Sequence, residues 1–138
     1  MFKKASILKN RVIVKISGKE NEYFLNNILT NDINKIDGKS ICLTCLLTPQ
    51  GKILFDLFVF REETRMGFFD YFIECSEKQA INLIQKLKLY SLRLDVSFKK
   101  EDLDVIISNY FYQDEISRKD IRFKNNDIYR HFKKLKKN

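Results

Sequence analysis

The residue with the clearest potential for chemistry is the carboxylate of Asp56, which lies inside the apolar run ILFDLFVF. Side chains of an extended strand alternate between two faces, so Asp56 shares a face with Phe58 and Phe60. The opposite face is apolar as well, and we expect both faces to be covered. A carboxylate buried there without partners would cost several kcal/mol. Asp56 is therefore expected to meet backbone amides, a cation or a ligand's donors, unless it lies near a sheet edge and reaches water or a lysine.

Two other polar segments could contribute to a binding site. Asn31 and Asp32 follow the first expected helix and could present an amide and a carboxylate to a small molecule, although capping is the commoner role of such residues. The segment TPQG at residues 48–51 fits a hairpin turn, in which Gln50 is a central residue and Gly51 tolerates a left-handed backbone. The turn by itself indicates no function.

The sequence lacks the established catalytic and nucleotide-binding motifs. It contains no phosphate-binding glycine loop, no HExxH and no supported Ser/His/Asp arrangement. Cys42 and Cys45 form C-x-x-C, but positions three apart in a strand point to opposite faces, and no second pair completes a metal site. We therefore expect these two and Cys75 to be buried structural thiols. No metal site and no self-contained active site are predicted.

The composition indicates one globular domain. The chain has 138 residues, of which 44% are hydrophobic and 32% charged, as is usual for a folded protein of this size. No run approaches the roughly 18 apolar residues of a membrane span. The amino terminus lacks the apolar region of a secretory signal. No membrane partner and a cytoplasmic location are the resulting expectations.

The net charge of +8 is concentrated at the carboxyl end. From Arg118 onward, nine Lys and Arg residues face only Asp120 and Asp127. Phosphate contacts by such lysines would give salt-dependent RNA binding, and the aromatic residues at 110–112 could stack on bases. A solvated helix docked on the body is the plainer interpretation. The candidate nucleic-acid residues are Lys133, Lys134, Lys136 and Lys137.

Alternation and capping patterns predict the order of elements. Capping boxes at Ser17 and Ser76 predict helices that end near residues 30–32 and 90, and a third helix is expected over 127–136. Short connections favour antiparallel pairing of the strands. The expected fold class is α+β, an antiparallel sheet with helices on one face. The expected strands are 6–10, 11–18, 40–48, 52–62, 67–75, 92–98 and 103–108.

Three segments, LTNDI (29–33), LLTPQGKILFDLFVF (46–60) and LKLYSLRLDV (87–96), resemble the amino-terminal part of the YgfZ-type folate-binding proteins. These are relatives of the glycine-cleavage T-protein (aminomethyltransferase) that assist iron–sulphur protein maturation. The likeness runs over residues 7–112. It implies that residues 1–113 form one β-β-α-β-β-β-α-β-β half of a duplicated folate-binding domain, whose halves exchange their first strands. Residues 114–138 would then be a basic carboxy-terminal segment with a helix.

The resemblance also implies a tetrahydrofolate site that faces a central channel. Asp56 would be its ligand carboxylate, with Asn31, Asp32, Gln50 and Gly51 close to it. Aminomethyltransferases carry an Asp pair on this strand, and Phe55 replaces the first member here. The downstream motif KGCYxGQE is also missing. These departures argue against transferase catalysis. The implied role is non-enzymatic, in iron–sulphur protein maturation or one-carbon metabolism.

Other functions and assemblies stay open at this point. The second hypothesis is an RNA- or protein-binding module, linked to tRNA modification, that uses the basic tail. The third is a true aminomethyltransferase. A lone half-domain would leave Phe-rich sheet faces uncovered. We therefore expect either a homodimer that rebuilds the duplicated domain or a missing carboxy-terminal half, with iron–sulphur proteins as further partners.

Overall fold

The structure is a computed structural model that describes residues 3–113 and 116–135. Its described residues form nine strands, two α-helices and one short 3-10 helix, η1. None of the described helices is long and apolar enough to cross a membrane. The elements are β1 (Ala5–Leu8), β2 (Arg11–Ser17), α1 (Asn21–Ile28), η1 (Ile33–Lys35), β3 (Ser40–Leu47), β4 (Ile53–Glu63), β5 (Phe69–Ser76), α2 (Glu77–Tyr90), β6 (Ser97–Glu101), β7 (Asp104–Ser108), β8 (Ile116–Asp120) and β9 (Tyr129–Lys133).

The strands follow one continuous order, β1-β7-β9-β8-β3-β4-β5-β2-β6, that falls into two parts. We call β3-β4-β5-β2-β6 the central sheet and β1-β7-β9-β8 the small sheet. They are joined where β3 and β8 run parallel over two residue pairs, Ser40 with Lys119 and Ile41 with Asp120. All other strand pairs of the order are antiparallel. The α+β class predicted from the sequence is confirmed.

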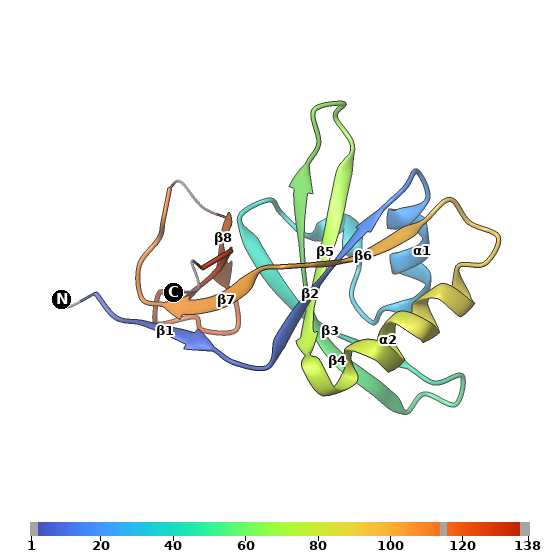
Figure 1. Cartoon of the computed structure of the whole chain (residues 1–138), viewed down its shortest axis with the longest axis horizontal. Coiled ribbons are helices and arrows are strands. Elements are labelled where there is room, and N and C mark those ends of the chain that lie inside the picture. Colours follow the sequence, from blue (N-terminus) through green and yellow to red (C-terminus); the bar gives the residue numbers. More distant parts are fainter. Residues whose placement is uncertain (1–2, 114–115, 136–138) are drawn as a thin grey trace.

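Two pairs of consecutive strands cross between the sheets (Figure 1). β1 pairs with β7 in the small sheet, whereas β2, which follows it directly, pairs with β5 and β6 in the central sheet. In the same way β6 belongs to the central sheet and β7 to the small one. The chain therefore exchanges strands between two sheets within a single copy.

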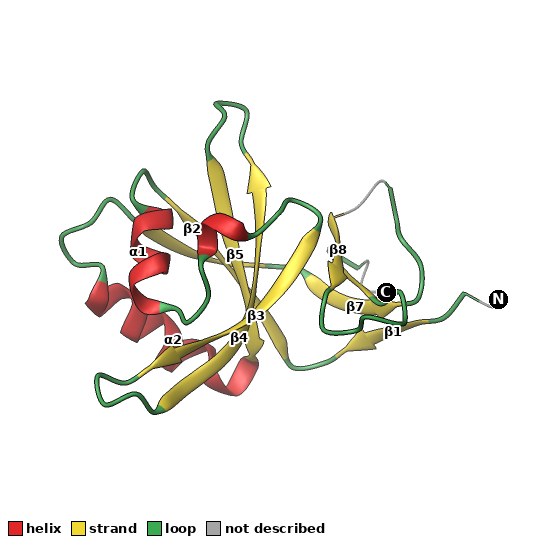
Figure 2. Ribbon diagram, turned by 180° about the vertical axis from the view of Figure 1, so that it is seen from behind, coloured by secondary structure: helices red, strands yellow, loops and turns green. Residues whose placement is uncertain are grey.

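Both α-helices lie on one face of the central sheet, as expected (Figures 1 and 2). α1 buries Phe24 and Leu25, and α2 buries Leu83 and Leu87. These side chains join one core cluster with residues of β2, β4 and β5. The face of β4 that carries Phe55, Leu57 and Val59 points into this cluster.

The opposite face of the central sheet is covered by the small sheet. Phe58, Phe60 and Phe72 form a second core cluster, to which β7 adds Val105 and β9 adds Phe132. The ring of Phe60 stacks on Phe72 at 5.0 Å and on Phe132 at 4.3 Å. The sequence-based expectation that this Phe-rich face is left for a second copy is therefore wrong, because the same chain covers it.

The helix predicted over 127–136 is also wrong: the structure has β9 at Tyr129–Lys133. Its apolar residues do recur at helical spacing. However, β9 forms ladders with both β7 and β8, and these backbone hydrogen bonds together with the packing of Phe132 outweigh local spacing. Tertiary pairing of this kind is invisible in a local pattern.

Two helix starts differ from the predicted capping boxes. Ser17 still belongs to β2, where it pairs with Ser97, and α1 begins only at Asn21. Ser76 is the N-cap of α2 as predicted, but its side chain makes no capping hydrogen bond. The strand predicted over 92–98 lies at Ser97–Glu101 instead.

Candidate functional site

A cleft of about 530 Å³ opens between the central and the small sheet. It lies on the face of β4 that carries Phe58, beside the second core cluster. The central sheet contributes Arg11, Leu43, Asp56 and Phe58 to its lining. Ile7, Leu8 and Lys9, from β1 and the turn after it, line the cleft together with Arg122 and Arg130.

Asp56 lines this cleft but is exposed. The expectation of a carboxylate buried among apolar side chains is therefore wrong. Phe58 and Phe60 of the same strand face are buried by the small sheet, whereas Asp56 lies one step nearer the hairpin and is not covered. It pairs with Cys45 in the β3–β4 ladder, so both side chains lie on the cleft face of the sheet.

Beneath the cleft, the carboxylate of Glu74 on β5 is fully buried. Arg11 Nε lies 2.8 Å from Glu74 Oε2, and Arg130 Nη1 lies 2.8 Å from each carboxylate oxygen. A buried carboxylate needs such partners, since desolvation otherwise disfavours its charge. Glu74 therefore holds two arginines at the cleft.

Asp120, at the end of β8, holds a third arginine. Arg122 donates from Nε to Oδ1 at 2.9 Å and from Nη2 to Oδ2 at 2.7 Å. Burial alone would raise the pKa of Asp120, but the hydrogen bonds and charge of Arg122, with the charge of Arg130, hold it below the usual range. The same bidentate contact raises the pKa of Arg122.

The three guanidinium groups gather around one aromatic ring. Their central carbons lie 4.0 Å (Arg130), 4.7 Å (Arg122) and 6.0 Å (Arg11) from the ring centroid of Phe58. Distances of this size allow cation–π attraction. The cleft thus combines an acidic acceptor (Asp56), an aromatic ring (Phe58) and a cationic wall. The cationic wall consists of Arg11, Arg122 and Arg130. Such a site can accept hydrogen bonds from a heterocycle and donate hydrogen bonds to oxyanions.

Asn31 and Asp32 lie at a different place. They line a separate hollow of about 270 Å³ with Asp37, Cys42 and other residues. Cys42 and Cys45 lie three positions apart in β3, so Cys42 points away from the cleft face. Asp32 Oδ1 accepts a hydrogen bond from Asn34 N at 3.0 Å and so caps η1. The capping interpretation is confirmed for Asp32, and the structure does not bring this pair to Asp56.

Gln50 and Gly51 form the exposed tip of the β3–β4 hairpin. Gly51 has φ +84°, as predicted for a left-handed exit, and its N–H donates to Thr48 O at 2.9 Å. Asp56 lies five positions beyond Gly51, roughly 16 Å along a strand. The hairpin turn is confirmed, but it lies outside the cleft.

The candidate nucleic-acid lysines are only partly described. Lys133 Nζ lies 5.6 Å from the ring centroid of Tyr112, and Lys134 Nζ lies 3.0 Å from Asp102 Oδ2. Lys136 and Lys137 lie outside the described residues. Lys133 is the last residue of strand β9 and Lys134 follows it, so neither lies on the expected helix.

Sequence reasoning missed the cationic wall of the cleft and the buried Glu74 that holds two of its arginines. Glu74 gives the signal that singled out Asp56, a carboxylate in an apolar strand run, here YFIECS. Its partner Arg130 is 56 positions away and carries no such signal. Among the thiols, Cys75 is buried as predicted, whereas Cys42 and Cys45 are half-buried, and all three are free. In the described part of the chain, no group of three His, Cys, Asp or Glu could hold a metal ion.

Comparisons with known proteins agree with this architecture. No family model matches the chain. It is 28% identical over 97 residues to the mitochondrial iron-sulfur cluster assembly factor IBA57 homolog of Neurospora crassa, and 27% over 95 residues to that of Pyricularia oryzae. Each match covers 69% of this chain but only 22% and 24% of those proteins. The chain thus spans about a quarter of the length of these relatives.

A solved structure extends the comparison to the fold. The glycine cleavage system aminomethyltransferase T of Bartonella henselae matches with a TM-score of 0.75 at 12% identity. The match covers 96% of this chain and 42% of that one. The strand-exchanged sheets therefore define an aminomethyltransferase-like fold, of which this chain holds a part. Together with the two sequence relatives, this fold supports the resemblance to the YgfZ-type, glycine-cleavage T-protein-like proteins that the sequence motifs indicated.

Proposed function

We propose that this chain is a folate-binding protein that assists iron–sulphur protein maturation. The observation that carries the proposal is the cleft between the exchanged sheets, lined by Asp56, Phe58 and three arginines. Two relatives named as iron–sulphur cluster assembly factors support the biological role. Iron–sulphur proteins are therefore the proposed partners, and a more general role in one-carbon metabolism is the nearest variant of this proposal.

The residues of the cleft fit a reduced pterin ring. Asp56 offers two carboxylate oxygens to ring N–H donors, and Phe58 and Leu43 offer apolar surface to the ring. When bound, tetrahydrofolate would supply ring nitrogens that carry a one-carbon unit. Asn31, Asp32, Gln50 and Gly51 line no part of the cleft, so we do not assign them to this ligand.

The proposed role is binding rather than catalysis. Phe55 occupies the position of the first carboxylate of the aminomethyltransferase pair, and its side chain is buried among the residues under the helices. Asp56 is the only carboxylate that lines the cleft in the described residues. A true aminomethyltransferase is therefore the weaker candidate. A transfer assay with an aminomethyl donor and tetrahydrofolate is expected to give no turnover.

Ligand binding is tested by thermal unfolding with and without tetrahydrofolate. We expect the ligand to raise the melting temperature of the wild type and to raise that of Asp56→Asn much less. Asp70→Asn is the matched control, because Asp70 is a carboxylate of β5 that does not line the cleft. The proposal fails if tetrahydrofolate raises the melting temperature of neither the wild type nor the control.

Cysteine labelling gives an independent readout of the same site. Cys45 is half-buried and pairs with Asp56 on the cleft face, whereas half-buried Cys42 points to the opposite face. Bound tetrahydrofolate is expected to slow alkylation of Cys45 and to leave that of Cys42 unchanged. Equal protection of both thiols would indicate general stabilisation instead of binding in the cleft.

The second candidate function is RNA binding linked to tRNA modification. The observation that favours it is the exposed Lys134, which precedes two further lysines. Deletion of residues 118–138 would remove β9 and most of β8, so substitutions are the better test. Lys134→Gln, Lys136→Gln and Lys137→Gln together are expected to lower RNA retention if the tail binds RNA. The matched control replaces Lys78, Lys86 and Lys88 of α2 by Gln, and equal losses would exclude the tail.

A homodimer and a cytoplasmic location are also part of the proposal. Because the Phe-rich face is covered within one chain, a dimer would have to use another surface, and a missing carboxy-terminal half stays the alternative. Light scattering at micromolar concentration distinguishes a 16.5 kDa particle from one of twice that mass. The matched relatives are named as mitochondrial proteins, so the location is tested by fractionation of tagged protein.

A further inference from the structure

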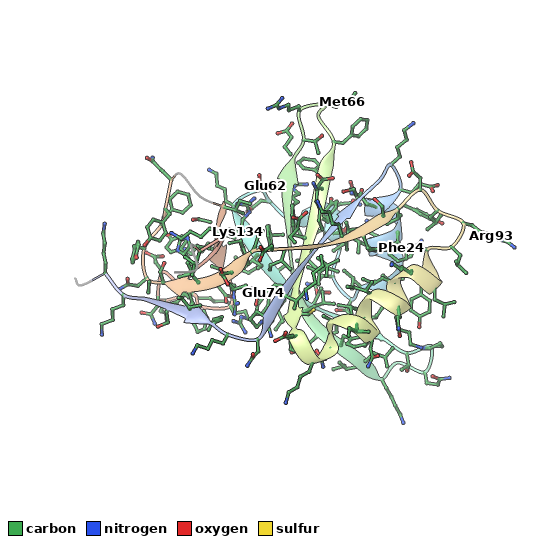
Figure 3. All side chains as sticks on the ribbon, viewed as in Figure 1. Phe24, Glu62, Met66, Glu74, Arg93 and Lys134 are labelled. Atoms are coloured by element: carbon green, nitrogen blue, oxygen red, sulfur yellow. The ribbon has the colours of Figure 1, made fainter. Side chains whose placement is uncertain are left out.

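We propose that Arg11, Arg122 and Arg130 form an oxyanion subsite that binds the carboxylate end of the ligand in the cleft. The inference deepens the folate proposal, on which it rests for the identity of the ligand. It assigns a function to the cationic wall rather than to Asp56. Figure 3 shows Glu74, which holds two of these arginines, inside the molecule between the sheets.

The first support is that Arg130 has unused donors although it is buried. Its side chain is only 7% exposed. Both of its hydrogen bonds to Glu74 start from Nη1. In the described part of the chain Nε has no hydrogen-bond partner, and its distance of 3.6 Å to Asp120 Oδ2 is beyond hydrogen-bond range. Nε thus faces the carboxylate of Asp120, and the donor that Arg130 keeps for a ligand is Nη2, which makes no hydrogen bond among the described residues and is not buried as Nε is.

The two other arginines also keep donors available. Arg122 uses Nε and Nη2 on Asp120, and among the described residues its Nη1 makes no hydrogen bond. Arg11 uses only Nε, on Glu74. All three side chains line the same cleft. An oxyanion within the cleft could therefore receive hydrogen bonds from more than one guanidinium.

The charges at the cleft favour an anion. Three guanidinium groups share two buried carboxylates, those of Glu74 and Asp120, so one positive charge of this group is uncompensated. The two carboxylates lie beneath the cleft with exposures of 0% and 1% and do not line it. They fix the orientation of the guanidinium groups in advance, which lowers the entropy cost of binding an oxyanion.

Asp56 sets the orientation of the ligand. Its carboxylate also lines the cleft and would repel an anion, while it attracts N–H donors. A ligand that carries both N–H donors and carboxylates matches the two kinds of charged group that line the cleft. A tetrahydrofolate bound with its glutamate carboxylates at the arginines satisfies this pattern, whereas a pterin without the glutamate would leave the cationic wall unused.

The alternative is that the arginines only join the two sheets. A purely structural network predicts that their substitution lowers stability but not the relative affinity for ligands with and without carboxylates. Arg122 is the best position to separate the two roles, since its side chain is 40% exposed and buried Asp120 keeps the charge of Arg130 beside it when Arg122 is replaced. Arg93, which points away from the body in Figure 3, is the matched control.

The experiment measures affinities by calorimetry for tetrahydrofolate and for a tetrahydropterin that lacks the glutamate tail. We expect Arg122→Gln to weaken tetrahydrofolate binding about tenfold and the tailless pterin less than twofold, with Arg122→Lys in between and Arg93→Gln without effect. Equal losses for both ligands, or none, would overturn the inference. Melting temperatures without ligand verify that each variant is folded.

A second probe separates failure of the subsite from failure of the folate proposal. Citrate, which carries carboxylates, and inorganic pyrophosphate, which carries phosphates, are added alone. If neither pterin ligand binds but citrate stabilises the wild type more than Arg122→Gln, the oxyanion subsite stands and the folate proposal fails. A larger effect of pyrophosphate than of citrate would assign the subsite to phosphate and overturn the carboxylate assignment. Equal effects on wild type and variant would overturn the subsite itself.

Discussion

Arg130 on β9 and Glu74 on β5 join the two sheets through a buried ion pair, with Arg130 Nη1 2.8 Å from each carboxylate oxygen of Glu74. The two residues are 56 positions apart, and their side chains are 7% and 0% exposed. Because the pair bridges the central and the small sheet, it helps to fix the width of the cleft between them. Stability and binding therefore depend on the same contacts.

The first prediction concerns Glu74→Gln. The substitution keeps the shape of the side chain but leaves Arg130 buried with only the more distant carboxylate of Asp120, at 3.6 Å, as a counter-charge, so we expect a loss of about 3–5 kcal/mol in the free energy of unfolding. Urea denaturation measures it. Asp70→Asn is the control: Asp70 pairs with Lys15 at 3.5 Å nearer the surface and should cost at most about 1 kcal/mol. Similar losses in the two variants would contradict the buried-pair account.

The second prediction tests whether the small sheet packs within the same chain. Phe132→Ala removes a buried ring that stacks on Phe60 at 4.3 Å, and a loss of about 3–5 kcal/mol is expected. Phe111→Ala is the matched control, since Phe111 is 54% exposed. The comparison is made at several protein concentrations. A loss that varies with concentration would mean that the Phe-rich face is covered by another copy.

The elements predicted correctly are those whose signals are local. The alternation of residues 40–48 and 52–62 around the TPQG turn predicts β3 and β4, and the turn has the left-handed glycine that it requires. The face assignments in β4 also hold, because Phe58 and Phe55 belong to different core clusters. α2 follows from its helical spacing, with Ser76 at the N-cap.

What could not be predicted depends on contacts between distant segments. The local pattern of residues 127–136 predicts a helix. In the folded chain β7 and β8 lie on the two sides of β9 and form hydrogen bonds with its backbone. The burial of Asp56 was overestimated because the extent of the small sheet cannot be seen in the sequence. The arginines of the cleft come from three segments, around residues 11, 122 and 130. Their meeting around Phe58 is a property of the tertiary fold alone.

The third prediction is a pH dependence that involves Asp120. Burial works to raise the pKa of this carboxyl, but its contacts with Arg122 and Arg130 outweigh burial and lower it. The unfolded chain therefore binds the proton at a higher pH than the folded one. The stabilisation is complete above the unfolded pKa of about 4 and is lost as pH falls through the lower, folded pKa.

The measurement is the free energy of unfolding from neutral pH down to about pH 2. We expect stability to fall less steeply in Asp120→Asn than in the wild type below about pH 4, since the variant has no proton to bind at this position. Asp37→Asn is the comparison. Hydrogen bonding from the Lys39 backbone lowers the pKa of Asp37, but this residue is exposed. If the free energy of unfolding of Asp120→Asn falls below about pH 4 as steeply as that of the wild type, Asp120 is not the source of the pH dependence.

The fourth prediction concerns the three thiols. Burial raises the pKa of Cys75 to about 11, so at pH 8 almost none of it is thiolate, and its side chain is inaccessible. We expect alkylation of the native protein to modify half-buried Cys42 and Cys45 and to spare Cys75, as followed by peptide mass spectrometry. Urea should make all three reactive. Early modification of Cys75 would show that β5 opens without global unfolding.

The last prediction tests the close approach of the Gly18 backbone to the backbone of Asp95. This glycine has φ +111°, and a Cβ added there would lie 2.2 Å from the backbone oxygen of Asp95. Gly18→Ala must therefore displace the segment before β6, in addition to the strain of a positive φ, which costs roughly 1–2 kcal/mol by itself. Gly51→Ala is the control, because Gly51 has φ +84° but open space around its Cβ position. We expect Gly18→Ala to lose at least about 2 kcal/mol more than the control in urea unfolding. Equal losses would mean that β6 does not hold its place beside β2, and the exchange of strands between the sheets would have to be reconsidered.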